Sequence, residues 1–188
     1  PAPFRVLNRK GSARCLLVCD HAGNRIPSAL GRLGLSKQEL QRHIAWDPGT
    51  AHIGRHLSRA LGATAILATY SRLVADLNRG PDSKECMLDV SDHTRIPGNT
   101  RLSPAHKRRR IREIFNPYHR EINALLRRHL KKKNIPVLLS IHSFTPKMNG
   151  YRRPWHIGIL WNRDDRISRQ LVLRLRRDHP KLVIGENE

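Results

Sequence analysis

Short apolar runs alternate with amphipathic stretches along most of the chain. Several of these runs are hydrophobic at consecutive positions, which is typical of strands in a sheet covered on both faces. Stretches with helical periodicity lie between them, so the sequence predicts an α/β sandwich with a largely parallel sheet and one domain over residues 1–188. The predicted strands are Cys15–Asp20, Ala63–Tyr70, Leu73–Leu77, Val137–Ile141, His156–Trp161 and Leu182–Ile184.

The helical stretches carry recognisable start and stop signals. Ser36–His43 begins with Ser36 and has Glu39 three residues later, which is the spacing of a capping box. The long region Pro104–Lys133 contains Pro117, which is expected to kink or divide the helix because proline has no backbone N–H. The other two predicted helices are Thr50–Leu61 and Ile167–Arg177.

A histidine directly follows two of the predicted strands. His21 follows Cys15–Asp20, and His142 follows Val137–Ile141. Ligands in such folds bind beyond the carboxyl ends of the strands, so these two imidazoles can converge on one point. Two imidazoles and one carboxylate form a hydrolytic zinc site, although each histidine alone is more often a surface or hydrogen-bonded residue.

The third ligand has more than one candidate. Asp47 precedes the predicted helix Thr50–Leu61, where a carboxylate can also simply complement the helix N-terminus. Asn24 is close to His21, but a neutral amide is a poor zinc ligand. Asp20 adjoins His21 and is expected to point to the opposite face of the strand.

The stretch "SRLVADLNR" places Asn78 and Arg79 at the end of a predicted strand. A guanidinium binds carboxylates through two hydrogen bonds, so this pair is a candidate for holding an acidic substrate. Arg72 and Arg153 are further candidates. The alternative for each arginine is a surface ion pair, which a chain this basic makes common.

Charge adds a second candidate function. The chain has 36 Lys and Arg against 15 Asp and Glu, a net charge of +21, and many of the cations lie in the helical region 105–133. This favours a nucleic acid or another polyanion as a partner, although charge runs are usually solvated helix faces. Only 5% of residues are aromatic, which argues against a base-stacking platform.

The small number of cysteines and the lack of long apolar stretches bear on the cellular compartment. Three cysteines are too few for a disulfide framework and indicate a reducing compartment, so we expect a cytoplasmic protein. No apolar stretch approaches the roughly 20 residues of a membrane span, so no membrane association is expected.

Six separated strings follow one another along the chain: "CDHAGNRIP", "HIAWDPGT", "SRLVADLNR", "IPGN", "HSFTPKMNGYRRPWHIGILW" and "GENE". Together, in this order, they resemble the N-formylglutamate amidohydrolase family. The resemblance implies a metal-dependent hydrolase that cleaves N-formyl-L-glutamate, or a similar N-acyl amino acid, with Zn²⁺ or another divalent metal. It also implies a three-layer sandwich with a mixed, mostly parallel sheet, similar to zinc carboxypeptidases.

The resemblance further implies roles for single residues. His21 and His142 match the two histidine ligands. Asn24 stands where zinc carboxypeptidases have an acidic ligand, so Asp47 is expected to complete the set. Asn78 and Arg79 resemble the pair that holds a substrate carboxylate.

The acidic base is expected at Glu188, with Glu186 as the other acid nearby. Family members are expected to continue beyond Glu188, so the domain is expected to lack its C-terminal part. The alternative function is a catalytically reduced member that binds RNA or a ribosome through the basic region 105–133.

Overall fold

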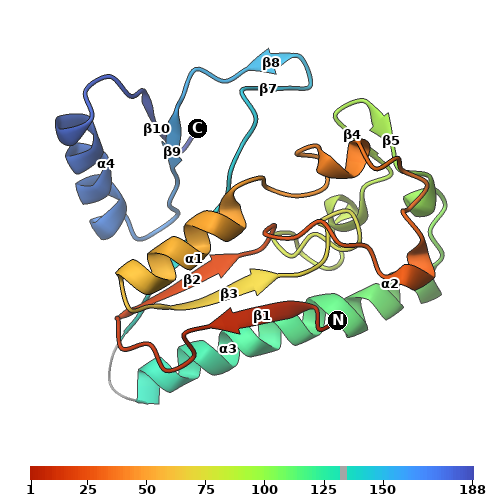
Figure 1. The fold of residues 1–188 in the computed structure, drawn as a ribbon, viewed down its shortest axis with the longest axis horizontal. Helices are drawn as coiled ribbons and strands as arrows, with labels where there is room; N and C mark the ends of the chain where they lie inside the picture. Colours follow the sequence, from red (N-terminus) through yellow and green to blue (C-terminus); the bar gives the residue numbers. More distant parts are fainter. Residues whose placement is uncertain (132–134) are drawn as a thin grey trace. The chain divides into compact units, whose positions relative to one another are not determined.

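The computed structural model describes residues 1–131 and 135–188 (Figure 1). The chain divides into two compact units, Pro1–Phe144 and Thr145–Glu188, and each is described by itself. The expectation of one domain over residues 1–188 stays a prediction.

The first unit is built on a four-stranded sheet with the order β1-β3-β2-β6. Strands β2, β3 and β6 run parallel to one another, and β1 pairs antiparallel with β3 at the edge. The sheet is therefore mixed and mostly parallel, which confirms the predicted fold class. Its strands are β1 (Phe4–Leu7), β2 (Cys15–Cys19), β3 (Thr64–Ala68) and β6 (Val137–Ser140).

Both faces of the central strands β2 and β3 are buried, which explains their consecutive apolar positions. Leu16 and Val18 of β2 face one hydrophobic cluster, which includes Tyr118 and Leu125 of helix α3 (Asn116–Lys131). The alternate residues of β2 face a second cluster, against helix α1 (Thr50–Ala60). Helices thus cover both faces, which gives three layers (Figure 1).

The long basic region is divided as the proline predicts. Helix α2 (Pro104–Arg110) passes into a π-helical turn, η5 (Ile111–Phe115), and α3 begins at Asn116, directly before Pro117. The missing N–H of Pro117 removes one helical hydrogen bond, and the wider π turn forms next to it. The predicted end at Lys133 lies outside the described residues.

Two predicted elements are wrong. Leu73–Leu77 is buried but forms turns instead of a strand, because its N–H groups bond to other loop residues and not to a strand, as from Val74 to the Ser71 carbonyl and from Asp76 to the Cys86 carbonyl. The capping box of Ser36 and Glu39 forms, but only a 3₁₀ turn, η2 (Glu39–Gln41), follows it. The other short elements of this unit are η1 (Ser28–Leu30), η3 (Lys84–Met87), β4 (Val90–Ser91), β5 (Thr94–Arg95) and η4 (Pro97–Asn99).

The second unit contains one helix between two parallel strands, preceded by a short hairpin. The hairpin pairs β7 (Lys147–Met148) with β8 (Tyr151–Arg152). Strand β9 (Ile157–Ile159), helix α4 (Arg166–Asp178) and strand β10 (Ile184–Glu186) follow. These three elements confirm the predicted order of strand, helix and strand.

The structure bears on two further predictions, about membrane association and about the cysteines. Within residues 1–131 and 135–188, none of the helices has the length and apolar character needed to cross a membrane. All three cysteines are free thiols. The cytoplasmic location stays a prediction.

Buried Arg110 ties α2 to the long loop that follows β3. Its guanidinium donates hydrogen bonds to the carbonyls of Val74 and Gly98 and to the side chain of Asn99. Asn99 in turn donates to the carbonyl of Leu73. The shape of this loop therefore depends on a buried cation whose hydrogen bonds all go to neutral oxygens.

We predict that Arg110→Met destabilises the fold by about 3 kcal/mol, because buried carbonyls lose their donors. Chemical denaturation monitored by circular dichroism measures the loss. The control is Arg109→Met, since the neighbouring side chain is 63% exposed and its loss should leave stability nearly unchanged. Equal stabilities of the two variants would contradict this assignment.

Candidate metal centre

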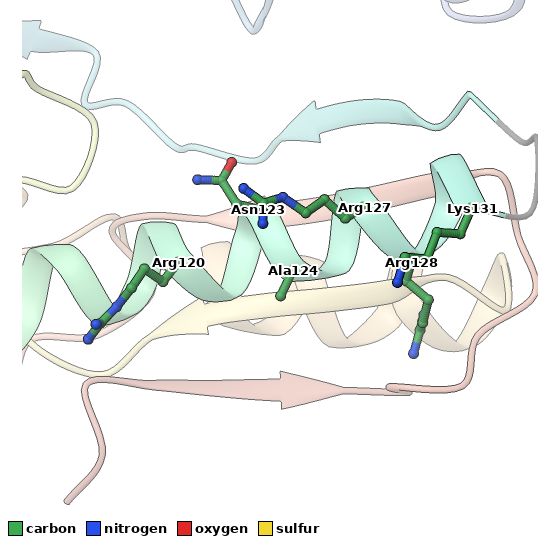
Figure 2. A pocket seen from close by; sticks show the side chains of 6 residues that line it. All are labelled: Arg120, Asn123, Ala124, Arg127, Arg128 and Lys131. Carbon is green, nitrogen blue, oxygen red and sulfur yellow. The ribbon is translucent and has the colours of Figure 1, made fainter.

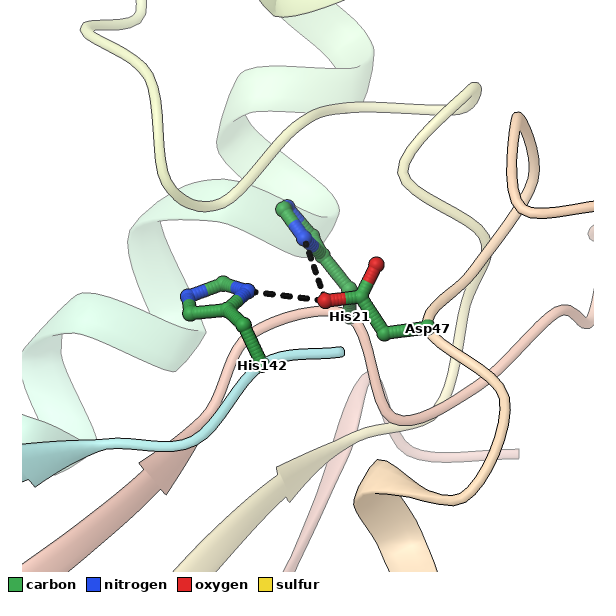
Figure 3. A group of neighbouring side chains, drawn as sticks. All are labelled: His21, Asp47 and His142. Atoms are coloured by element: carbon green, nitrogen blue, oxygen red, sulfur yellow. Dashed lines mark hydrogen bonds and ion pairs between the residues drawn. The ribbon is translucent and has the colours of Figure 1, made fainter. Parts of the chain in front are cut away.

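Three of the predicted metal ligands lie together at the carboxyl end of the sheet. His21, Asp47 and His142 each offer a ligand atom, and these atoms all lie within 4.8 Å of one another. Figure 3 shows both imidazoles directed at the same carboxylate. Nδ1 of His142 lies 2.9 Å from Oδ2 of Asp47, and Nδ1 of His21 lies 3.5 Å from the same oxygen.

The strand register brings the two histidines together. Val18 of β2 pairs with Ser140 of β6, so His21 and His142 both follow at the same end of neighbouring strands. Directly after His21 the chain passes tightly against β3, since a Cβ at Gly23 would lie 2.2 Å from the carbonyl oxygen of Thr69.

Backbone hydrogen bonds place Asp47 between the histidines. Its N–H donates to the carbonyl of His21, and its carboxylate accepts from the N–H of Ser143. The alternative of a simple helix cap does not describe this residue. The N-cap of α1 is Gly49, and no side chain caps that helix.

Asp76 fixes the orientation of the His21 ring. Its Oδ1 lies 2.7 Å from Nε2 of His21, while its Oδ2 accepts two hydrogen bonds from Arg72. The N–H of Asn78 donates to the same carboxylate. A carboxylate behind a histidine is the usual outer partner of a metal ligand, because it holds the tautomer and the ring direction.

His142 is supported from the other side by Ser140 and Asp20. The Ser140 hydroxyl lies 3.0 Å from Nε2 of His142, and Asp20 lies 3.6 Å from the same nitrogen. Asp20 accepts a buried hydrogen bond from Tyr118 of α3. It therefore points away from His21, as expected from neighbouring positions, and lies behind the second histidine.

The site differs in exposure from one ligand to the next. His21 and Asp47 are 2% and 1% exposed, whereas the side chain of His142 is 30% exposed. Solvent or a small molecule therefore reaches the group from the side of His142.

Charges in this group stabilise one another. Burial by itself raises the pKa of Asp47, but its contacts with His142 and His21 hold that pKa well below its usual range. Burial also raises the pKa of Asp76, which the bond to His21 and the charge of Arg72 nevertheless lower to about 2. Burial lowers the pKa of His142, and the contacts with Asp20 and Asp47 raise it to about 9.

These residues fit a divalent cation. Two buried carboxylates remain ionised only because positive charge lies beside them, and a cation supplies that charge as the protonated histidines do. Nδ1 of His21 is buried and has no hydrogen-bond partner among residues 1–131 and 135–188. Because Nε2 of the same ring is bound to Asp76, Nδ1 is the atom presented to the site.

The two predicted substrate-binding arginines of the first unit, Arg72 and Arg79, lie in different surroundings, and their roles stay predictions. Arg72 pairs with Asp76 and lies 3.7 Å from an oxygen of Asp47, so it supports the ligands. The guanidinium of Arg79 pairs with Glu85 at 2.6 Å, on the surface.

Two predicted site residues belong to the second unit, and their roles stay predictions. Arg153 donates to the Thr145 carbonyl. Glu188 follows β10 and is exposed.

Asn24 donates to the carbonyl of Leu40, a bond that shapes the loop.

Sequence reasoning missed Asp76 and His43. Nε2 of His43 lies 2.7 Å from the carbonyl oxygen of Ser143 and 3.3 Å from Oδ1 of Asp47. Its position four residues before Asp47 was the available signal. Asp76 was not identified because the pattern of Leu73–Leu77 predicts a strand. The available signal was its position two residues before the Asn-Arg pair.

Comparison with known proteins identifies the family. The model of the N-formylglutamate amidohydrolase family matches residues 13–188, so the chain belongs to this family of hydrolases. This confirms the resemblance found in the motifs. A comparison with curated proteins gave no match.

Two solved structures are similar over the whole of this chain. Gene product Atu2144 from Agrobacterium tumefaciens is 34% identical, with 74% of its own chain covered and a TM-score of 0.95. N-formylglutamate amidohydrolase from Ralstonia eutropha JMP134 is 17% identical, with 76% covered and a TM-score of 0.69. The second likeness shows the fold.

We predict that Asp76→Asn lowers the pKa of His21 in chelator-treated protein, because the ionised Asp76 stabilises the protonated ring. NMR titration of the histidine ring signals measures the change. Asp82→Asn is the control, since this exposed carboxylate has no contact with His21 among the described residues. An unchanged His21 pKa in Asp76→Asn would contradict the geometry.

Proposed function

We propose that this chain is a metal-dependent amidohydrolase that cleaves the formyl amide of N-formyl-L-glutamate, or the small acyl amide of a similar N-acyl amino acid. Water adds across the C–N bond, and formate and the free amino acid are released. Family membership supports the reaction. The convergence of His21, Asp47 and His142 supports the dependence on a metal, and it is the observation that carries the proposal.

His21, Asp47 and His142 are the residues that would hold Zn²⁺ or another divalent ion. When bound, such an ion polarises the formyl carbonyl and lowers the pKa of water toward about 7. Asp76 keeps the His21 ring in the ligating tautomer, and Arg72 in turn holds Asp76. Because His142 is partly exposed, the substrate amide can reach the candidate metal centre from that side.

Of Arg72 and Arg79, Arg79 is the better candidate for holding the substrate carboxylate. Arg72 is committed to the Asp76 carboxylate through two hydrogen bonds. The ion pair of Arg79 with Glu85 is 41% and 61% exposed, and such surface pairs contribute little to stability. A substrate carboxylate can therefore replace Glu85 and be held by the guanidinium fork. Asn78 adjoins it and stays a candidate partner.

The group that moves the proton is proposed from the resemblance. Glu188 would take a proton from water and return it to the leaving amine, which is general acid–base catalysis by one carboxylate. Its position in the second unit leaves this role a proposal.

We predict that the full chain binds one divalent metal ion, which His21→Ala, Asp47→Ala and His142→Ala each lose. The physical reason is that each change removes one of three ligands. Mass spectrometric metal analysis after dialysis measures the content, and formate release from N-formyl-L-glutamate measures the activity. His52→Ala, an exposed histidine of α1, is the control and should keep both.

Two results would contradict the proposal. One is wild-type protein without stoichiometric metal after growth and dialysis with added Zn²⁺. The other is formate release that survives both chelation and His21→Ala, because catalysis would then lie elsewhere.

We predict that Arg79→Ala raises the KM for N-formyl-L-glutamate by at least about tenfold, with a smaller change in kcat. The loss of an anchoring charge weakens ground-state and transition-state binding alike, which appears in KM. Steady-state kinetics measure both constants. Arg101→Ala, an exposed arginine in the following loop, is the control. A KM that stays at the wild-type value would remove Arg79 from the substrate site.

A second candidate function is supported by charge alone. We propose that the basic region 105–133 also binds a polyanion, since the net charge of +21 attracts one whatever the reaction is. Nucleic acid is the partner considered, and the two functions use different residues.

A further inference from the structure

One face of α3 carries an open hollow lined by cations. Its lining consists of six residues of that helix, which we call the α3 cation groove: Arg120, Asn123, Ala124, Arg127, Arg128 and Lys131. Figure 2 shows their side chains along one side of the helix, with the small Ala124 between the long ones. None of these residues belongs to the candidate metal centre.

Helical spacing puts the groove residues in one line. Positions 120, 123, 124, 127, 128 and 131 repeat at three or four residues, so they share a face. The opposite face is fixed by Tyr118 and Leu125, which are buried in the core. The cations from Arg120 to Lys131 therefore extend about 16 Å along a rigid helix.

No carboxylate lines this groove. Among residues 1–131 and 135–188, the structure gives no hydrogen bond or ion pair to Arg120, Arg127 or Lys131. Arg128 donates a hydrogen bond to the hydroxyl of Thr64, at 3.4 Å.

Some basic residues elsewhere on this helical region are paired. Arg109 and Arg112 both contact Glu113, and Glu121 of α3 is held by Arg9. Arg127 and Lys131 lie four residues apart with like charges, which destabilises a helix slightly. The groove thus concentrates cations on a helix face that no carboxylate of the described residues lines.

The groove composition points to a phosphate backbone as the occupant. Guanidinium groups bind phosphate through paired hydrogen bonds, and a fixed row of them matches a row of phosphates. The groove has no aromatic side chain on which an unpaired base could stack, which disfavours a single strand. Contacts to phosphates position a duplex without reading its sequence.

We propose that the α3 cation groove binds the phosphate backbone of duplex nucleic acid, independently of its sequence. This inference deepens the second candidate function and rests on it. It does not depend on the amidohydrolase reaction.

The test compares two triple variants of the full chain with wild type. Arg120→Gln, Arg127→Gln and Lys131→Gln together remove three groove cations while keeping helix-forming residues. The control combines Lys37→Gln, Arg55→Gln and Arg59→Gln, which are exposed cations without ion pairs in the described part of the chain. Both variants lose the same three charges. Circular dichroism verifies that both are folded.

The probe is a fluorescently labelled 20-base-pair DNA duplex of mixed sequence, titrated by anisotropy across a range of salt concentrations. Each phosphate contact contributes about 0.9 to the slope of log Kobs against log salt. The groove variant should therefore lower the magnitude of the slope by about 2.7. The control variant should keep the wild-type slope.

Three outcomes would overturn the proposal, and each has a separate meaning. No binding of the duplex by wild type would remove this proposal, and no binding of either the duplex or the matching single strand would also remove the second candidate function. Equal losses in both variants would assign binding to overall charge and not to the groove. Wild-type binding to the matching single strand as tight as to the duplex would remove the duplex as the occupant.

Discussion

The site depends on the contact of the buried Asp47 carboxylate with two imidazoles. It lies between two imidazoles, and its own N–H bonds to the carbonyl of His21, so one residue joins the loops that follow β2 and β6. A buried carboxylate without positive neighbours is costly. The parallel pairing of β2 with β6 supplies those neighbours. Fold, charge balance and the proposed chemistry therefore meet at this position.

The two other carboxylates near Asp47, those of Asp76 and Asp20, have different partners. Asp76 lies behind His21 and is held by Arg72, while Asp20 lies behind His142 and is held by Tyr118. Each histidine thus has its own outer carboxylate, and each carboxylate is anchored to a different part of the first unit. Such anchoring would keep the three candidate ligand atoms in place before an ion binds, which would lower the cost of binding.

Much of the fold and part of the candidate site can be predicted from the sequence. The remaining site residues could not be predicted, for physical reasons. Apolar runs covered on both faces indicate parallel strands, and polar residues at strand ends indicate the site, so His21 and His142 are found directly. Asp76 escapes because a buried run such as Leu73–Leu77 looks the same in a strand and in packed turns. The roles of Arg72 and Arg79 depend on which carboxylate each meets, and a sequence with this many cations does not specify such pairings.

The most direct test of the central claim is X-ray absorption spectroscopy of the zinc-loaded chain at the zinc edge. Two imidazoles and a carboxylate predict nitrogen and oxygen ligands at about 2.0–2.2 Å, with the multiple scattering of histidine rings. A spectrum dominated by sulfur at about 2.3 Å, or one without imidazole scattering, would contradict the claim, because zinc would then be bound by cysteines or without His21 and His142.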